Sequence, residues 1–102
     1  MSERSPEVSA PQPEGVVLVR YWAAARAAAG VDCDTLPVSG STTLARVLDD
    51  VRSLRADRPR LADVITVCSV LVGDRPVGKA DPADVVLAPG DTVELLPPFA
   101  GG

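Results

Sequence analysis

Residues 44–54 read LARVLDDVRSL and decide the fold class of this chain. Their apolar members recur at i, i+3, i+4, i+7 and i+10, namely Leu44, Val47, Leu48, Val51 and Leu54. This spacing aligns them along one side of an α-helix, and charged residues occupy the opposite side. We therefore predict one long helix with a buried face and a solvated face. Because proline interrupts helical hydrogen bonding, Pro59 marks the predicted end of this helix.

Two strands and a short helix are predicted before the long helix. Val16–Trp22 is a β-branched and aromatic run of strand length. Alternation gives it an inner set of Val17, Val19 and Tyr21 and an outer set of Val16, Leu18, Arg20 and Trp22. Ala23–Ala29 favours a short helical segment that Gly30 ends. Cys33–Val38 favours a second strand that returns along the first.

Shorter segments are predicted after the long helix. Val67–Val72 favours an apolar strand, and the tight-turn pair Gly73 and Asp74 follows it. Arg75–Val77 favours an edge strand, because Pro76 has no amide donor for a central position. The remaining segments are a helical turn or loop at Leu61–Ile65, a turn or short strand at Asp81–Leu87, a type II turn at Ala88–Asp91 and a last strand at Thr92–Leu96.

This order of elements predicts an α+β roll in which a mixed sheet covers one main helix. The first and last strands would pair at the centre of the sheet. The β-grasp architecture satisfies this order, whereas a split β-α-β fold needs a second full-length helix that the pattern lacks. We expect residues 15–96 to form the domain. Residues 1–14, rich in proline, serine and glutamate, are predicted to be a disordered leader, and residues 97–102 a flexible tail.

The composition excludes several classes of function. The 102 residues suffice for a single domain, and the net charge of −4 has the wrong sign for binding nucleic acid. No histidine is present, so imidazole catalysis and imidazole metal binding are excluded, and no GxxxxGK phosphate loop occurs. No apolar run reaches the length of a membrane span and no cleavable leader is visible, so we expect a cytoplasmic protein. Such a chain is poorly equipped to be an enzyme by itself.

The two cysteines do not suggest a disulfide or a metal site. Cys33 and Cys68 lie 35 positions apart without a CxxC spacing, and we expect both to be small buried residues. No function is assigned to them or to Lys79, the single lysine.

The sequence closes with Pro97-Pro98-Phe99-Ala100-Gly101-Gly102. The two prolines would end the last strand and hold the chain extended. The small residues that follow would make the tip slender enough for the terminal carboxylate to enter a narrow pocket. A carboxylate on such an arm can be activated as an acyl-adenylate and can receive a nucleophile. Another protein would have to supply the ATP, the metal and the base.

Three segments carry a resemblance to a known family. They are Val19–Ala23 with Arg26 and Gly30, Leu71–Val77, and Gly90–Gly102, which ends in LLPPFAGG. Together with the β-grasp order, they resemble the MoaD family, the ubiquitin-like sulfur-carrier small subunits of molybdopterin synthase, which are related to the thiamine carrier ThiS. The resemblance covers residues 16–102, and the ending is its specific part.

The resemblance implies a sulfur-transfer cycle. An ATP-dependent adenylating enzyme, MoeB-like, would adenylate Gly102, and sulfur would replace AMP to give a C-terminal thiocarboxylate. The tail would then enter the active site of the large, MoaE-like synthase subunit and donate sulfur to precursor Z, with Gly101 granting access. The carrier itself would bind no cofactor and no metal, since the ATP is used by its partner. It would form a heterotetramer with the large subunit.

The resemblance also implies a partner-binding surface on the outer, helix-free face of the sheet. Trp22 and Leu96 fall on this face, and Pro76 stands at a matching position. The tail residues expected to contact the partner are Pro97, Pro98, Phe99 and Ala100. Arg26 matches an arginine of the family, and it would either pair with an acidic group on a partner or be an ordinary surface arginine.

Three alternatives stay open from the residues. A carrier that feeds thiamine, cysteine or another thio-metabolite would use Gly102 in the same way. A ubiquitin-like modifier would be conjugated to lysines of other proteins. A β-grasp binding module would carry its final Gly-Gly incidentally.

Overall fold

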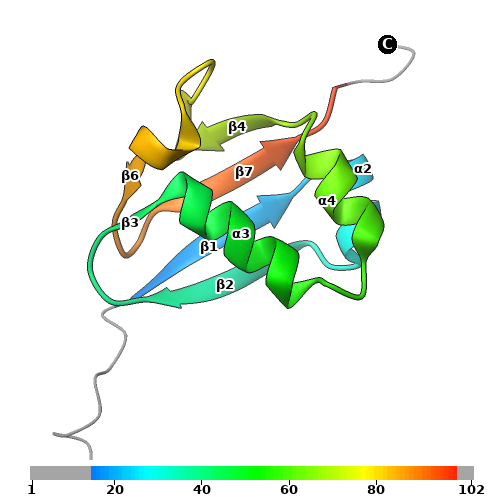
Figure 1. Ribbon diagram of the computed structural model, residues 1–102, viewed down its shortest axis with the longest axis horizontal. Coiled ribbons are helices and arrows are strands. Elements are labelled where there is room, and N and C mark those ends of the chain that lie inside the picture. Colours follow the sequence, from blue (N-terminus) through cyan, green and yellow to red (C-terminus); the bar gives the residue numbers. More distant parts are fainter. Residues whose placement is uncertain (1–14, 99–102) are drawn as a thin grey trace, which may run out of the picture.

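A five-stranded mixed sheet forms one layer of the molecule, and α3 lies across one face of it (Figure 1). The computed structural model describes residues 15–98. Its elements are β1 (Gly15–Tyr21), α2 (Ala24–Ala29), β2 (Cys33–Val38), β3 (Thr42–Thr43), α3 (Leu44–Leu54), α4 (Pro59–Ile65), β4 (Ser69–Val72), β5 (Arg75–Pro76), the 3₁₀ turn η1 (Pro82–Asp84), β6 (Val86–Leu87) and β7 (Thr92–Leu96).

The first and last strands pair at the centre of the sheet, as predicted. The strand order is β2-β1-β7-β4-β5, with β1 parallel to β7 and the other neighbours antiparallel. Val19 stands opposite Val93 and Tyr21 opposite Leu95. The short strands β3 and β6 pair separately. This topology confirms the predicted α+β β-grasp fold.

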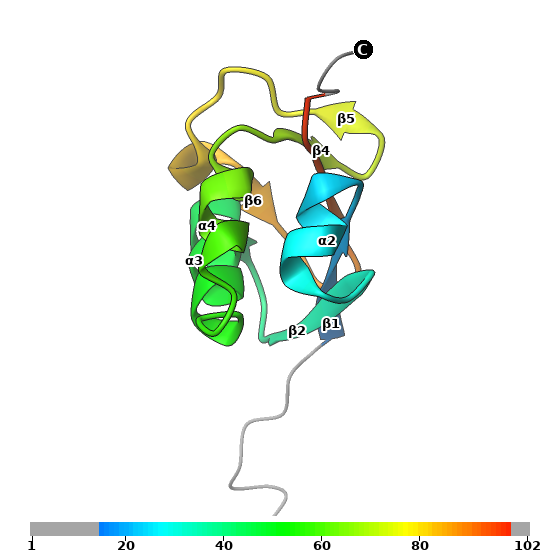
Figure 2. The ribbon, with the colours of Figure 1, turned by 90° about the vertical axis from the view of Figure 1, so that its right-hand side faces the viewer.

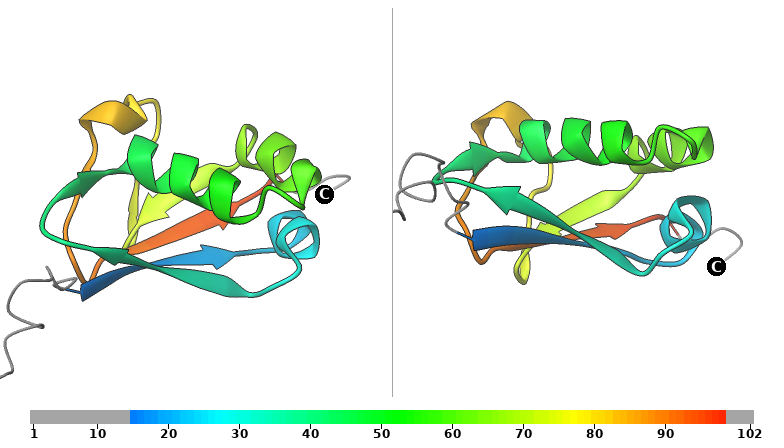
Figure 3. Two further views of the ribbon diagram at one scale, coloured as in Figure 1. Left: turned by 60° about the horizontal axis from the view of Figure 1, so that its bottom comes forward. Right: turned by 90° about the horizontal axis from the view of Figure 1, so that it is seen from below.

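The core lies between the sheet and α3. Alternate residues of the two central strands point into it and are buried, namely Val17, Val19, Tyr21, Val93 and Leu95. The helix contributes Leu44, Val47, Leu48 and Val51, which are also buried. Figure 3 shows α3 and α4 on one side of the sheet, whereas none of the helices covers the opposite side. The predicted inner and outer sets of the first strand are therefore confirmed.

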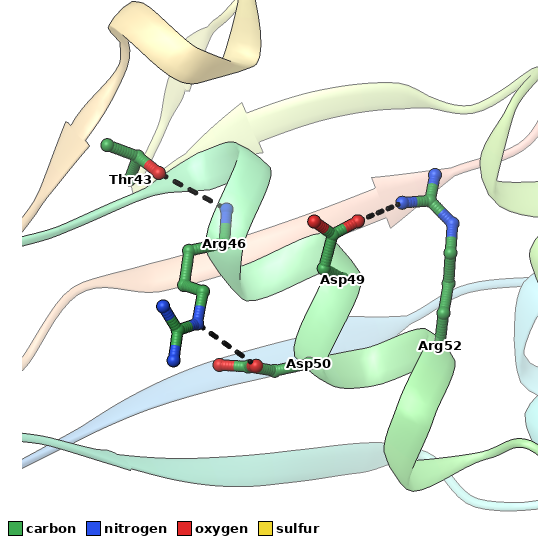
Figure 4. Close-up of polar contacts among 5 residues, drawn as sticks. All are labelled: Thr43, Arg46, Asp49, Asp50 and Arg52. Carbon is green, nitrogen blue, oxygen red and sulfur yellow. Dashed lines mark hydrogen bonds and ion pairs between the residues drawn. The ribbon is translucent and has the colours of Figure 1, made fainter.

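The outer surface of α3 is polar (Figure 4). The Thr43 hydroxyl accepts a hydrogen bond from the Arg46 backbone N–H at 3.2 Å and thereby caps the helix. Arg46 pairs with Asp50 at 3.4 Å, and Arg52 pairs with Asp49 at 3.1 Å. Because these paired side chains remain exposed to solvent, this surface is the predicted solvated face. Such exposed pairs stabilise a helix only slightly.

The helices α2 and α4 lie at the end of the sheet where β1 and β7 finish (Figure 1; Figure 2). As predicted, Gly30 ends α2, and it adopts a left-handed φ of 81°. A Cβ at Gly30 would meet only the guanidinium of Arg58, an exposed side chain that can move aside, so the left-handed backbone is the reason that glycine is favoured here.

Two predictions about the end of the long helix were wrong. Leu54 is 51% exposed, although its spacing placed it on the buried face. At 3.6 residues per turn it points about 80° away from Leu44, and it is the last residue of α3. Pro59 does not end this helix but begins α4, since proline fits the first turn of a helix.

Two further predictions were wrong about side-chain positions. Val67 is 60% exposed rather than part of a strand, because its backbone N–H donates to the Val64 carbonyl in the turn that ends α4. Cys33 is exposed, since it lies opposite Arg20 on the outward side of β2. Cys68 is half-buried, and burial raises the pKa of its thiol to about 11, so it stays protonated at neutral pH. Both cysteines are free.

A polar cluster joins β1, β2 and the end of α3. The Tyr21 hydroxyl donates to Asp34 Oδ2 at 2.7 Å, and the Arg55 guanidinium donates to both oxygens of the same carboxylate. Burial acts to raise the pKa of Asp34, but the hydrogen bonds from Arg55 and Tyr21 outweigh it and lower that pKa. Burial, and then Asp34, raise the pKa of Tyr21, which keeps its hydroxyl a donor.

We expect Asp34→Asn to lower the free energy of unfolding by roughly 1.5–3 kcal/mol at pH 7, the range for hydrogen bonds to a charged group. Because the folded pKa of Asp34 is lowered, its contribution is complete above the ordinary value of 3.8 and is lost as the pH falls below it. Urea unfolding from pH 7 to pH 3 should therefore show the two proteins converging in acid.

The matched control is Asp49→Asn, which removes an exposed ion pair. It should change the stability by less than about 0.5 kcal/mol at either pH. A constant difference between wild type and Asp34→Asn across the titration would contradict the assignment.

Candidate functional site

The uncovered side of the sheet is the candidate site, and we call it the outer face. The outward-pointing residues of its central strands are Leu18, Arg20, Trp22, Ser69, Leu71, Thr92, Glu94 and Leu96, with Pro76 on the edge strand. These residues alternate with the buried ones, so the face follows directly from the pleat of the sheet. It combines apolar side chains with one Arg and one Glu.

The backbone around Trp22 is firmly held. The Trp22 N–H donates to the Leu95 carbonyl at 3.2 Å, and the Trp22 carbonyl accepts from Ala25 N–H at 2.9 Å. Ala23 follows with a φ of 51°, in the left-handed region that L-residues rarely adopt. This turn leads the chain directly into α2. Trp22 is thus fixed between β7 and the start of a helix.

The Trp22 side chain contacts two charged neighbours. Its Nε1–H donates to Glu94 Oε1 at 2.9 Å, and the Arg20 guanidinium carbon lies 5.0 Å from the centre of the indole. Arg20 and Glu94 are themselves Cα partners across β1 and β7. Trp22 remains 40% exposed. The outer face therefore presents an indole that a carboxylate holds from one side and a cation contacts from another.

The predicted surface residues Trp22, Leu96 and Pro76 lie on this one face. Tyr21 and Leu95 are register partners, so Trp22, which directly follows β1, lies at the same level as Leu96, the last residue of β7. Pro76 is exposed at the sheet edge. The outward placement of Trp22 and Leu96 is confirmed, and their contact with a partner stays a prediction.

The other predicted site residues are placed differently. Pro97 is buried because it continues the inward alternation of β7, so it packs into the domain rather than forming exposed surface, whereas Pro98 is exposed. Arg26 lies on α2 and pairs with Asp32 at 3.6 Å, with both side chains largely exposed. The remaining predicted residues, Phe99, Ala100, Gly101 and Gly102, lie outside the described residues.

Sequence reasoning missed Glu94 and Arg20 as functional candidates. Alternation placed Arg20 in the outer set of the first strand, and Glu94 lies outward in the same way between the buried residues Val93 and Leu95. Alternation does not show that Arg20 and Glu94 lie opposite each other, because the register between two strands that are far apart in the sequence cannot be read from either strand alone. In the structure Leu18 pairs with Thr92, and this register brings Arg20 opposite Glu94.

Residues 15–98 contain no group of three His, Cys, Asp or Glu side chains that could hold a metal ion. Within the same range no helix is long and apolar enough to cross a membrane.

The chain was compared with known families, curated proteins and solved structures. The model of the ThiS family matches residues 19–102. The chain belongs to the ThiS family. The comparison with curated proteins found no significant match.

Solved structures agree with the family. This ThiS-family chain is similar to the HVO 2177 protein of Haloferax volcanii, with 27% identity over 100% of both chains and a TM-score of 0.68. It is similar to SAMP1 of Haloferax volcanii, a small archaeal modifier protein, with 25% identity over 86% of this chain and 100% of that one, and a TM-score of 0.67.

A third similar structure is a complex of subunits 1 and 2 of the molybdopterin-converting factor from Helicobacter pylori. The identity is 22%, the coverage is 85% of this chain and 99% of the matched chain, and the TM-score is 0.54. The ThiS-family chain is accordingly a ThiS-like sulfur carrier with a ubiquitin-like β-grasp fold.

Proposed function

We propose that this sulfur carrier serves the synthesis of molybdopterin. The observation that carries the proposal is the family match, which extends to Gly102 and so includes the Gly101-Gly102 ending. The resemblance of the segments around Trp22 and Leu96 to the MoaD family supports the choice of pathway. The outer face supplies a surface on which a partner can dock while the tail reaches the partner's active site.

The cycle has three steps. The Gly102 carboxylate attacks the α-phosphate of ATP on a MoeB-like adenylating enzyme and releases pyrophosphate. Sulfur at the oxidation level of sulfide then attacks the acyl carbon, displaces AMP and leaves a thiocarboxylate. In the active site of the large subunit the thiocarboxylate sulfur attacks a carbon of precursor Z and displaces an oxygen leaving group, and water then hydrolyses the resulting thioester, which leaves the sulfur on the product and returns the Gly102 carboxylate. We propose that this cycle runs in the cytoplasm, because its activation step uses ATP.

The proposed partners are the MoaE-like large subunit and the adenylating enzyme. Support for the first comes from the similar Helicobacter pylori structure, which is a complex of subunits 1 and 2 of the molybdopterin-converting factor. We extend that association to this chain as a heterotetramer with one carrier on each large subunit. The carrier binds neither cofactor nor metal in this scheme, because its partner uses the ATP.

Intact-mass analysis tests the proposal. Incubated with the adenylating enzyme, ATP and a sulfur donor, a fraction of the protein should gain the mass difference between sulfur and one oxygen, and fragmentation should locate this gain at Gly102. Reduction should leave the gain in place, because a thiocarboxylate is not a disulfide. A gain on Cys33 or Cys68 instead would contradict the proposal.

A second candidate function is that of a ubiquitin-like modifier. The similarity to SAMP1, described as a small archaeal modifier protein, favours it. Conjugation would join Gly102 to lysines of other proteins through isopeptide bonds, which digestion and mass spectrometry of cell extracts would reveal. A carrier for thiamine or another thio-metabolite would form the same thiocarboxylate but would dock onto a different acceptor enzyme.

A further inference from the structure

The Trp22 indole stands between two opposite charges on the outer face. Arg20 and Glu94 are Cα partners, yet among residues 15–98 neither takes part in an ion pair. Each contacts Trp22 instead, Glu94 through a hydrogen bond of 2.9 Å and Arg20 through the ring at 5.0 Å. The three side chains therefore form one unit rather than a salt bridge beside an aromatic residue.

The two charges have different tasks within this unit. Glu94 is half-buried and accepts the indole N–H, which restricts the rotation of the Trp22 side chain. Arg20 is exposed, and its contact with the ring face leaves its N–H donors without an acceptor among the described residues. A guanidinium prefers a carboxylate, which it can bind through two parallel hydrogen bonds.

A partner that covers the outer face must therefore provide a hydrogen-bond acceptor for the Arg20 guanidinium. Removing a guanidinium from water without an acceptor is costly, and in residues 15–98 the Glu94 carboxylate bonds the indole N–H rather than Arg20. An apolar partner surface with one carboxylate opposite Arg20 would cover the indole and satisfy the cation together. A purely apolar or basic surface would leave Arg20 unpaired.

We propose that Arg20, Trp22 and Glu94 form one recognition unit, in which Glu94 positions the indole and Arg20 selects a partner that carries a carboxylate. The proposal rests on the proposed function for the identity of that partner. It assigns specificity to two residues that lie outside the tail, so it separates the choice of partner from the chemistry at Gly102.

Calorimetric binding to the large synthase subunit tests the role of Arg20. Arg20→Glu should weaken binding at least about tenfold, because it places a new carboxylate opposite the carboxylate of the partner. Arg20→Lys keeps the positive charge and should weaken binding less. The matched control is Arg46→Glu, which changes the net charge equally on the exposed face of α3 and should stay within about twofold. Equal losses in Arg20→Glu and Arg46→Glu would reduce the effect to net charge and overturn the proposal.

The free chain tests the role of Glu94, since Trp22 is the single tryptophan and reports without interference. Glu94→Ala should increase acrylamide quenching of Trp22 fluorescence, whereas Glu94→Gln should stay close to wild type because its amide oxygen can still accept the indole N–H. Unchanged quenching in Glu94→Ala would overturn the positioning role. If the wild-type chain does not bind the large subunit, the proposed function fails, and the quenching result still decides whether Glu94 positions Trp22.

Discussion

We expect deletion of Gly102 to abolish sulfur transfer, which is the largest effect that we predict. The deletion leaves a terminal carboxylate on Gly101, but that group stands one residue, or about 3.3 Å, short of the reacting position. Displacements of this order cost more than about 100-fold in rate when reacting groups must meet in a fixed geometry. The measurement is thiocarboxylate formation in the presence of the adenylating enzyme, followed by molybdopterin formation with the large subunit.

The control for this deletion is Gly102→Ala, which keeps the length of the tail and adds one methyl group. If slenderness alone matters, it should be impaired as strongly as the deletion. If length matters most, it should retain measurable transfer. Thermal unfolding of both variants checks that the domain is intact. Wild-type rates of molybdopterin formation in the deletion variant would rule out the proposed function.

The second prediction is that Trp22→Ala weakens binding to the large subunit by about 2 kcal/mol or more, which corresponds to roughly 30-fold. Trp22 supplies the largest side chain of the outer face, and its position is fixed on both sides. The domain should stay folded, because Trp22 is 40% exposed and lies outside the buried core. We expect a loss of unfolding free energy of about 1–2 kcal/mol, against a typical total of about 5–15 kcal/mol.

Leu54→Ala is the matched control for Trp22→Ala. Leu54 is a large apolar residue with 51% exposure, but it lies on α3, on the other side of the sheet. Its truncation should leave the affinity within about twofold of wild type. If both variants bind equally well, the outer face is not the interface. If both bind equally badly, general loss of apolar surface explains the result better than a docking site.

Most of the fold could be predicted because local patterns and long-range packing agree. Alternation assigned the inner residues Val17, Val19 and Tyr21, and the sheet buries all three. The helical spacing from Leu44 to Val51 was equally reliable, since each of its apolar residues faces the sheet. Pairing of the first and last strands was predicted from the order of the elements, because a hairpin follows the first strand and the last strand comes after the helix.

The errors occurred where a local pattern was not enforced by packing. Leu54 continued the apolar spacing past the point where the helix still contacts the sheet, so nothing buried it. Val67 belonged to an apolar run, but its backbone N–H donates a hydrogen bond to the Val64 carbonyl in the turn after α4 and therefore does not pair in the sheet. Pro59 signalled a boundary correctly but not its kind, since proline stands equally well at the start of a helix.

The candidate site was only partly readable from the sequence. Trp22 and Leu96 could be placed outward by alternation, because each strand fixes its own parity. The buried position of Pro97 was missed, since the inward alternation of β7 continues one residue beyond the end of the strand. The link between Trp22, Arg20 and Glu94 depends on the register of β1 against β7, which only the assembled sheet reveals.

The central place of β7 also governs when the domain can form. This strand is the last of the sheet in chain order, yet it lies between β1 and β4 and contributes Val93 and Leu95 to the core. A nascent chain that stops before Thr92 leaves β1 without its parallel neighbour and the core open, so the domain folds only after β7 has been synthesised. Translation products that lack β7 therefore stay unfolded and are open to proteolysis, and only chains that contain it reach the folded form that competes for partners.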